Sequence, residues 1–310
     1  MNSGEKYTLI VSLNAAVDRI IYLPKFTPGQ INQAQQTLDQ AGGKGVNVAR
    51  ALTALGHKVL LIGFTGGITG QQIRDDLIHS HIPCSLIPIL GRSRNCYILI
   101  DQASGYHTVI NEGGPEISGA EYKQFSQELH RRLENAQLLI CSGSLPKGVP
   151  PSCYAQFIEM AREKGVKTLV DASNEPLRLA VAAQPYLIKP NREEASQLLG
   201  HDIFDNEALA AAQAIRTLGA EVGLLSLGDS GAVAAWDQGE TFIPAPQIHA
   251  INTIACGDAF LAGCAAAILN QQPVAEMLRW GIAAGSANAR VGGARITYND
   301  FAELLYQIQS

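Results

Sequence analysis

Hydrophobic residues along the chain fall into short apolar runs that alternate with longer segments of helical period. Short runs of β-branched and apolar residues predict buried strands, and apolar positions three and four residues apart predict amphipathic helices. This alternation favours a mostly parallel sheet covered by helices on both faces. The predicted strands are 7–13, 58–64, 84–90, 137–142, 166–171, 186–189 and 222–227. The predicted helices are 41–56, 71–80, 118–134, 151–164, 174–183, 192–199, 206–218, 257–269 and 273–290, the last two of which are expected to close the chain.

Three segments depart from that alternation. Segment 20–40 is interrupted by prolines and is neither helical nor strongly apolar, so we interpret it as irregular structure or exposed strand outside the main core. Segment 94–110 has the pattern of a hairpin that turns near 101–105. These two segments are expected to pair as a small separate sheet, and 232–243 is expected to form a second hairpin.

Length and composition narrow the class of protein. A chain of 310 residues is expected to form one large α/β domain, residues 1–310. Its net charge of −5 gives no indication of nucleic acid or an acidic membrane surface as a partner. No apolar run reaches the roughly 18 residues of a membrane span, and the polar start lacks the apolar segment of a signal peptide. Six cysteines without a C-x-x-C pair indicate reduced thiols, so we expect a cytoplasmic protein.

Polar clusters follow the predicted strands. Ligands of an open parallel sheet bind at the carboxyl ends of its strands, so the recurrence of these clusters predicts one binding edge. Each cluster alone could equally be turn or helix-cap chemistry. A P-loop and a G-x-G-x-x-G motif are both missing, which disfavours P-loop enzymes and standard dinucleotide dehydrogenases. The clusters are Asn14 with Asp18, Gly42–Gly45, Ser142–Pro146, Asp171–Ser173, Lys189–Glu194 and Ser226–Gly231.

The stretch 251–263 carries the most specific chemistry. β-Branched residues lead into Gly257-Asp258, and a run of small apolar residues then predicts a buried helix. Asp258 would lie in the first turn, beside backbone N–H groups that bind anions. A phosphate could occupy those N–H groups while Asp258 acts as a base. The alternative is that Asp258 only stabilises the start of the helix, where aspartate is common.

Four motifs together resemble the PfkB branch of the ribokinase-like sugar kinases, in order and at fitting spacing from Thr8 to about Gly293. They are Gly42-Gly43-Lys44-Gly45-x-Asn47-Val48-Ala49, Ser142-Gly143-Ser144-Leu145-Pro146-x-Gly148-Val149-Pro150, Lys189-Pro190-Asn191-x-x-Glu194 and Gly257-Asp258. Within this branch the chain looks most like the 1-phosphofructokinase and tagatose-6-phosphate kinase group. The resemblance implies a three-layer α/β/α domain with a mostly parallel central sheet and a small β-sheet lid, formed by segments of about 19–40 and 92–110. It also implies a homodimer that assembles through this lid.

The resemblance further implies a role for each matched residue. Asp258 would take the proton of the attacking sugar hydroxyl, next to an anion hole formed by the backbone N–H groups of Ala255, Cys256 and Gly257. Such positioning and charge stabilisation is what phosphoryl transfer requires. The residues implied to bind the sugar are Asp18, Gly42, Gly43 and Asn47. Those implied to bind a phosphate already on the sugar are Lys44, Arg94 and Ser144.

An ATP site and a magnesium ion follow from the same resemblance. Glu194 would hold Mg²⁺ through water, because this ion loses its hydration shell reluctantly. The residues implied to organise the ATP phosphates are Lys189, Asn191 and Glu194. Those implied to lie against the nucleotide are Ser226, Gly228 and Gly231, with Gly285, Ser286 and Asn288 near the adenine. The alternatives are solvated surface charges at Lys44 and Arg94 and close helix packing at Gly285 and Ser286.

Five positions depart from the family pattern. Ala15 replaces a usual proline, Gln33 a frequent arginine and Cys96 a frequent asparagine. The anion hole reads Ala255-Cys256-Gly257 instead of Gly-Ala-Gly, which removes the freedom of glycine at positive φ.

The expected activity is ATP-dependent phosphorylation of a sugar phosphate, with fructose 1-phosphate as the leading substrate and fructose 1,6-bisphosphate as its product. Tagatose 6-phosphate and an unphosphorylated sugar or polyol remain alternative substrates. A weakly catalytic, sugar-sensing binding protein is the alternative from a different class. The missing charge at Gln33 weakens the case for a phosphorylated sugar, and the cations of Lys44 and Arg94 support it.

Overall fold

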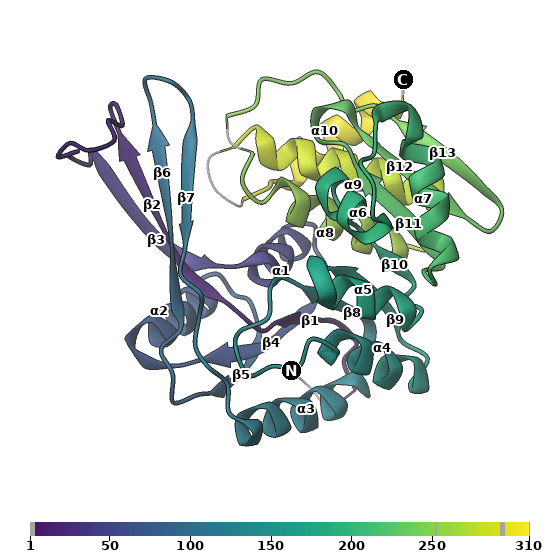
Figure 1. Ribbon diagram of the computed structural model, residues 1–310, viewed down its shortest axis with the longest axis horizontal. Coiled ribbons are helices and arrows are strands. Elements are labelled where there is room, and N and C mark those ends of the chain that lie inside the picture. Colours follow the sequence, from purple (N-terminus) through teal and green to yellow (C-terminus); the bar gives the residue numbers. More distant parts are fainter. Residues whose placement is uncertain (1–3, 252, 292–294, 310) are drawn as a thin grey trace.

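The computed structural model describes residues 4–251, 253–291 and 295–309. Within these ranges nine strands form a large sheet with helices on both faces, and four strands form a smaller sheet that stands to one side (Figure 1). The predicted three-layer α/β/α arrangement with a separate small sheet is therefore confirmed. Across the same ranges, no helix combines the length and apolar character needed to cross a bilayer.

The large sheet is parallel except at one edge. In spatial order its strands are β13 (Gly239–Ile243), β12 (Ala232–Trp236), β11 (Val222–Ser226), β10 (Leu187–Ile188), β9 (Lys167–Asp171), β8 (Ala136–Ser142), β1 (Tyr7–Ser12), β4 (Val59–Thr65) and β5 (Cys84–Pro88). The predicted hairpin at 232–243 forms the antiparallel edge, β12 and β13. Every residue of β1 and β4 is buried, as expected for parallel strands covered on both faces.

Helices cover the two faces of this sheet in two groups. On one face lie α3 (Gly119–Leu133), α4 (Cys153–Glu163), α5 (Asn174–Ala182), α6 (Arg192–Leu199) and α7 (Ala208–Thr217). On the other lie α1 (Lys44–Ala54), α2 (Gly67–His79), α8 (Cys256–Leu269), α9 (Val274–Ala289) and α10 (Tyr298–Gln309). Alternate side chains of β1 enter the two cores, Leu9 and Val11 on the first face and Ile10 on the second. Two short 3₁₀ segments, η1 (Asp205–Glu207) and η2 (Gly228–Ser230), complete the body.

The chain does not close with the helix predicted at 273–290, so that expectation is wrong. Helix α10 follows it, and its Phe301 and Leu304 are buried. The ring of Phe301 packs edge-on against Trp280 of α9, with 5.3 Å between ring centroids. Packing on α9 supplies the stability that a 12-residue helix lacks by itself.

The smaller sheet, which we call the lid, consists of β3 (Gln36–Gly42), β2 (Ala16–Leu23), β6 (Arg94–Asp101) and β7 (His107–Asn111) in spatial order. Pairing of the two predicted segments is confirmed, because β2 runs parallel to β6 over eight residue pairs. Segment 20–40 is more regular than predicted, since half of β2 and most of β3 lie within it and pair antiparallel. The inner face of the lid carries Asp18, Ile20, Cys96 and Ile98, and all four side chains are buried.

Candidate active site

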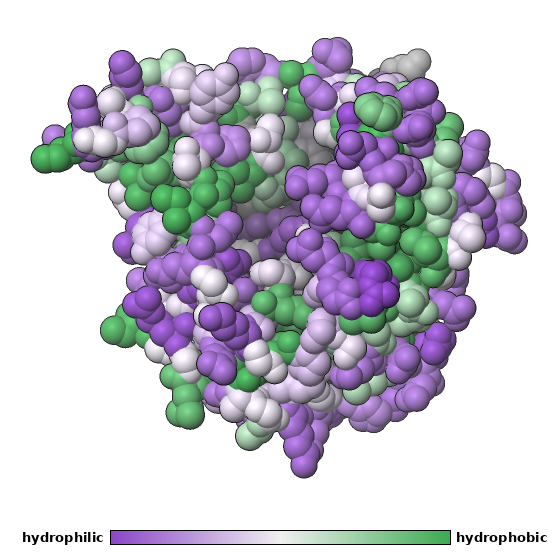
Figure 2. All heavy atoms as spheres, in the orientation of Figure 1, coloured by the Kyte–Doolittle hydropathy of each residue, from purple (hydrophilic) through white to green (hydrophobic). Residues whose placement is uncertain are grey.

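A cleft of about 550 Å³ lies between the carboxyl ends of the core strands and the inner face of the lid. Figure 2 shows it as a hollow between the lid and the body of the molecule. The polar clusters that follow β1 and β8 meet here, with the start of α1 and the start of α8. The predicted site residues that line the cleft are Asp18, Gly43, Lys44, Asn47, Arg94, Ser144, Ala255 and Asp258.

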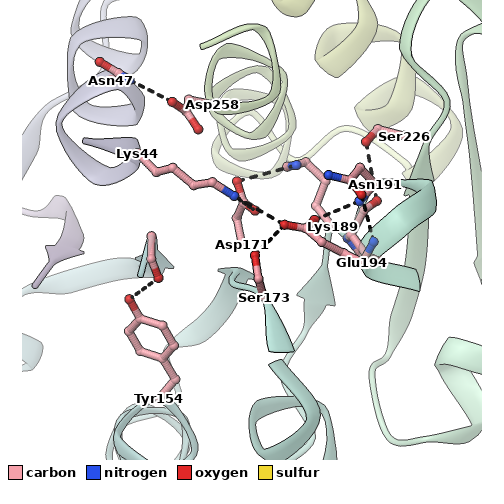
Figure 3. Close-up of polar contacts among 12 residues, drawn as sticks. Lys44, Asn47, Tyr154, Asp171, Ser173, Lys189, Asn191, Glu194, Ser226 and Asp258 are labelled. Carbon is pink, nitrogen blue, oxygen red and sulfur yellow. Dashed lines mark hydrogen bonds and ion pairs between the residues drawn. The ribbon is translucent and has the colours of Figure 1, made fainter. Parts of the chain in front are cut away.

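Asp258 lines this cleft from the first turn of α8, and its side chain is buried. Asn47 Nδ2, from α1, donates a hydrogen bond of 2.8 Å to Asp258 Oδ2 (Figure 3). Burial raises the pKa of the Asp258 carboxyl, and the negative charge of Asp171 raises it further, against the opposing effects of Lys44, Asn47 and Lys189. A carboxylate with a raised pKa at the edge of a cleft suits a general base.

Two lysines share one buried carboxylate beside the base. Lys44 Nζ, at the start of α1, lies 2.9 Å from Asp171 Oδ1 and 3.6 Å from Glu194 Oε1. Lys189 Nζ lies 3.5 Å from Asp171 Oδ2 (Figure 3). Burial alone would raise the pKa of Asp171, but the charges of Lys189 and Lys44 lower it overall. Asp171 therefore stays ionised and fixes both ammonium groups, one from the start of α1 and one from the residue that follows β10.

Glu194 is held in place at the start of α6. Its Oε2 accepts a hydrogen bond from the Asn191 backbone N–H, and Asn191 Oδ1 accepts one from the Glu194 N–H, which is a capping box. Its Oε1 accepts a 2.6 Å bond from Ser173 Oγ. Within the described ranges no three His, Cys, Asp or Glu side chains converge as a metal cage. A carboxylate with few carboxylate neighbours fits Mg²⁺ that keeps most of its water and is bound through phosphates.

Comparison with known proteins identifies this arrangement. Residues 8–300 match the model of the pfkB family carbohydrate kinases. The chain belongs to this family. A tagatose-6-phosphate kinase of Staphylococcus epidermidis is 34% identical over 306 residues, which cover 97% of this chain and 98% of that protein.

Solved structures of similar proteins have the same fold as this kinase. Phosphofructokinase-2 from Escherichia coli, in complex with potassium, superimposes with a TM-score of 0.92 and 27% identity over 99% of both chains. A possible 1-phosphofructokinase from Thermotoga maritima gives a TM-score of 0.89 and 25% identity over 97% of both chains. The fold of this kinase is therefore ribokinase-like, and the chain spans nearly the full length of these relatives.

The predicted anion hole of this kinase forms the turn that begins α8. Ala255 has φ 60° and ψ 10°, which is the left-handed region that glycine usually occupies. Asn288, buried in α9, donates a 2.7 Å hydrogen bond from Nδ2 to the Ile254 carbonyl oxygen. Asn288 therefore braces this turn from behind. Gly285 also supports the turn, because an added Cβ would lie 3.2 Å from the Cys256 carbonyl oxygen.

Among the residues predicted to lie against the nucleotide, Gly228 is open to a ligand, whereas Gly231 and Ser226 make contacts within the protein. Gly228 has φ 63° with open space where a Cβ would stand, which suits close approach of a ligand. Gly231 has φ 113°, and a Cβ there would lie 2.1 Å from the Ile243 carbonyl oxygen, so the glycine is required for internal packing. Ser226 Oγ donates to the Pro190 carbonyl oxygen at 3.4 Å, which ties β11 to the start of α6. Contact of Gly285, Ser286 and Asn288 with adenine stays a prediction.

The two cations predicted to bind a substrate phosphate have different surroundings. Lys44 is paired with carboxylates, as described above. Arg94, on β6 of the lid, hydrogen-bonds only neutral oxygens within the described part of the chain: the Asn14 carbonyl at 3.0 Å, and Asn111 Oδ1 and the Glu112 carbonyl at 3.3 Å. Its charge is therefore available to an anion in the cleft, whereas the charge of Lys44 is largely compensated.

Asp18 faces the same cleft from β2. Burial raises the pKa of its carboxyl to about 6, although Arg94 and Arg50 lower it in part. Gly42 is required opposite it, since a Cβ at Gly42 would lie 1.9 Å from Asp18 Oδ2. The Cys96 thiol hydrogen-bonds the Asp18 carboxylate, and burial raises the pKa of that thiol to about 11. The thiol is therefore a neutral donor at the position where the family often has asparagine.

Several residues of this site were not among the predicted site residues. Asp171 and Ser173 belong to a strand-end cluster that the sequence does show, but only the fold reveals that they hold Lys44 and Glu194. Asn111 ends β7 of the lid hairpin, Glu112 follows it, and both contact Arg94. Their signal in the sequence was weak, because polar residues after a hairpin are usually ordinary turn residues.

Proposed function

We propose that this protein is an ATP- and Mg²⁺-dependent kinase of a sugar phosphate that transfers the γ-phosphoryl group to a sugar hydroxyl. The leading reaction is fructose 1-phosphate to fructose 1,6-bisphosphate. Tagatose 6-phosphate is supported equally, because a relative named tagatose-6-phosphate kinase is 34% identical over nearly the whole chain. A homodimer that assembles through the lid is part of the proposal.

The observation that carries the proposal is the arrangement of charge along the cleft. A buried carboxylate of raised pKa, Asp258, stands at the start of a helix, where N–H groups attract phosphate. At the lid, Arg94 offers a guanidinium with neutral partners. A substrate with a hydroxyl at one end and a phosphate at the other matches these two ends.

In the proposed reaction, a sugar hydroxyl directed at Asp258 gives its proton to the carboxylate as its oxygen attacks the γ-phosphorus of ATP. The new P–O bond forms while the bond to the β-phosphate oxygen breaks, and ADP leaves with that electron pair. Asn47 fixes the orientation of the Asp258 carboxylate. Its Oδ1 has no hydrogen-bond partner among the described residues and is suited to accept a sugar hydroxyl. N–H groups in the first turn of α8 stabilise the charge on the transferred group.

The nucleotide end of the site is formed by residues of β9, α1 and α6 and by Lys189, which follows β10. Lys189 supplies positive charge for the ATP phosphates from a position fixed by Asp171. Lys44 was expected at the substrate phosphate, but its ion pairs with Asp171 and Glu194 favour a second role at the ATP phosphates. Glu194 would hold Mg²⁺ through water, and the ion would neutralise charge on the phosphates. Because Glu194 also lies 3.6 Å from Lys44, arrival of the ion would loosen that ion pair.

Replacement of the base tests the chemical step. The Asp258→Asn substitution keeps the size of the side chain but cannot accept a proton. We expect kcat to fall by ~10²–10⁴-fold, the usual contribution of a general base, with KM for the sugar phosphate little changed. Measurement of ADP release under saturating substrate, with the wild-type protein as reference, decides between these outcomes. A variant that keeps most of its kcat would remove Asp258 from the mechanism.

Replacement of the lid cation tests the substrate class. The Arg94→Ala substitution should lower kcat/KM for a sugar phosphate by roughly 10- to 100-fold, because a charge-assisted contact of about 1.5–3 kcal/mol is lost. It should barely affect a free sugar. The assay compares fructose 1-phosphate, tagatose 6-phosphate and free fructose in wild type and variant. A wild-type preference for the free sugar, or an Arg94→Ala variant with unchanged values, contradicts the sugar-phosphate proposal.

A further inference from the structure

Asn14 lies between Ser144, Arg94 and the loop that follows the lid hairpin, at the end of the cleft proposed to bind the substrate phosphate. It follows β1 directly, lines the cleft and is only 8% exposed. The sequence places it in a polar cluster, but neither the family resemblance nor the reaction described above gives it a role. Its contacts are with Ser144, with Arg94 and with the loop that follows the lid hairpin.

Asn14 holds Ser144 through its side chain and Arg94 through its backbone, and both of these residues are predicted to bind the substrate phosphate. Its side-chain Nδ2 donates a 3.1 Å hydrogen bond to Ser144 Oγ. Its backbone carbonyl accepts a 3.0 Å hydrogen bond from Arg94 Nε. Gly114 covers the remaining atom, because a Cβ at Gly114 would lie 2.3 Å from Asn14 Oδ1. The amide is therefore enclosed on two sides and has little freedom to turn.

The direction of the bond to Ser144 has a chemical consequence. A serine hydroxyl has one O–H donor and two lone pairs. Because the Asn14 N–H occupies a lone pair of Ser144 Oγ, the O–H of Ser144 remains available to donate to an anion. In the same way, Asn14 takes only the Nε–H of Arg94, and Asn111 and Glu112 take Nη1, which leaves Nη2 of the guanidinium for a phosphate among the bonds of the described residues.

We propose that Asn14 is a positioning residue that makes Ser144 a hydrogen-bond donor toward the phosphate of the substrate. This inference rests on the proposed function, because it assigns Asn14 to the phosphate end of a sugar phosphate. Asn14 acts through Ser144 and does not take part in the chemical step. It therefore governs KM for the sugar phosphate and leaves kcat and KM for ATP nearly unchanged.

Two substitutions of Asn14 separate this role from simple packing. Asn14→Ala removes the donor but leaves the Ser144 O–H free, so KM for the sugar phosphate should rise only by about 2- to 10-fold. Asn14→Asp has the same shape but only accepts, so it captures the Ser144 O–H and places a negative charge near the phosphate. KM should then rise by about 10- to 100-fold. A residue that only fills space would show the opposite order, since aspartate preserves the volume.

The experiment measures kcat and KM of the full-length variants with fructose 1-phosphate, tagatose 6-phosphate and free fructose. Asn206→Asp, at an exposed position in η1 outside the cleft, controls for the added charge. Ser144→Ala added to Asn14→Asp should raise KM for the sugar phosphate little further, because the introduced carboxylate would already have captured the Ser144 O–H. Should Asn14→Asp fail to fold, Asn14→Ala and Ser144→Ala combined must show clearly less than additive effects.

The outcomes distinguish the two proposals. If the wild type prefers free fructose, the sugar-phosphate function fails and the role of Asn14 fails with it. If the wild type prefers a sugar phosphate while Asn14→Asp is no worse than Asn14→Ala, only the role of Asn14 is overturned. Additive effects of the Asn14→Ala and Ser144→Ala substitutions, or a loss confined to kcat, overturn it as well.

Discussion

Replacement of Ala255 by glycine should stabilise this protein, although such a change usually destabilises one. Ala255 precedes α8 with φ 60° and ψ 10°, a left-handed conformation that costs a residue with a Cβ roughly 1–2 kcal/mol. Glycine removes this cost but adds about 0.4–1 kcal/mol of chain entropy to the unfolded state. The difference predicts that the free energy of unfolding stays equal or rises by up to about 1.5 kcal/mol.

Urea-induced unfolding of wild type and Ala255→Gly measures this difference directly. Ala210, exposed within α7, provides the matched control, because Ala210→Gly should lower the free energy of unfolding by about 1 kcal/mol. The backbone donors of the anion hole are unchanged by Ala255→Gly, so kcat should stay within about threefold of the wild-type value. If Ala255→Gly destabilised the protein as much as Ala210→Gly, the argument that Ala255 is strained would be refuted.

A bulkier residue at the same position gives the complementary result. Valine is β-branched and is a clear outlier at positive φ, so Ala255→Val should shift the turn that begins α8. Because Asp258 lies in the same turn, a displacement of about 1 Å can cost roughly 100-fold in rate. We therefore expect a large fall in kcat from valine beside a small change from glycine.

Two further predictions concern protonation and assembly. Asp258 must be ionised to accept a proton, so kcat/KM should fall as the pH drops through its raised pKa. Asn47→Ala removes a hydrogen bond that lowers this pKa, so the acidic limb of the pH profile of kcat/KM should move to higher pH. A limb that stays in place, or moves to lower pH, would separate Asp258 from the pH profile. The outer face of the lid holds a hollow of about 620 Å³ lined in part by Ile21 and Leu99, which we expect a second copy to cover. Leu99→Asp should then yield monomers in sedimentation velocity, and a monomeric wild type would contradict the dimer.

The sequence was sufficient to predict that several polar strand ends lie at one edge of the sheet. Ser142, Asp171 and Lys189 follow or end runs of apolar residues, and such runs become parallel strands whose carboxyl ends share one edge. The hydrophobic pattern thus brings residues far apart in sequence to one edge of the sheet without any detail of side-chain packing. The order of the strands was less accessible, because many arrangements satisfy the same pattern.

The sequence could not show how charges at that edge are distributed. Lys44 and Arg94 looked equivalent as candidates for a phosphate, yet within the described ranges Lys44 forms salt bridges with carboxylates and Arg94 hydrogen-bonds only neutral oxygens. The partners of Lys44 lie on β9 and α6, more than a hundred residues away along the chain. Helix α10 was not predicted for a different reason: its apolar pattern extends over only 12 residues, and its stability comes from contact with α9.

The position of Asp171 connects the two ends of the reaction. It holds Lys44 and Lys189 in place for the ATP phosphates, and its negative charge also helps to raise the pKa of Asp258. When phosphates draw the two lysines toward themselves, their neutralising effect on Asp171 weakens, and Asp258 would experience more of its charge. The affinity of Asp258 for a proton would therefore increase when the nucleotide binds. A base that becomes stronger once ATP is present favours proton transfer in the complete complex over the empty site.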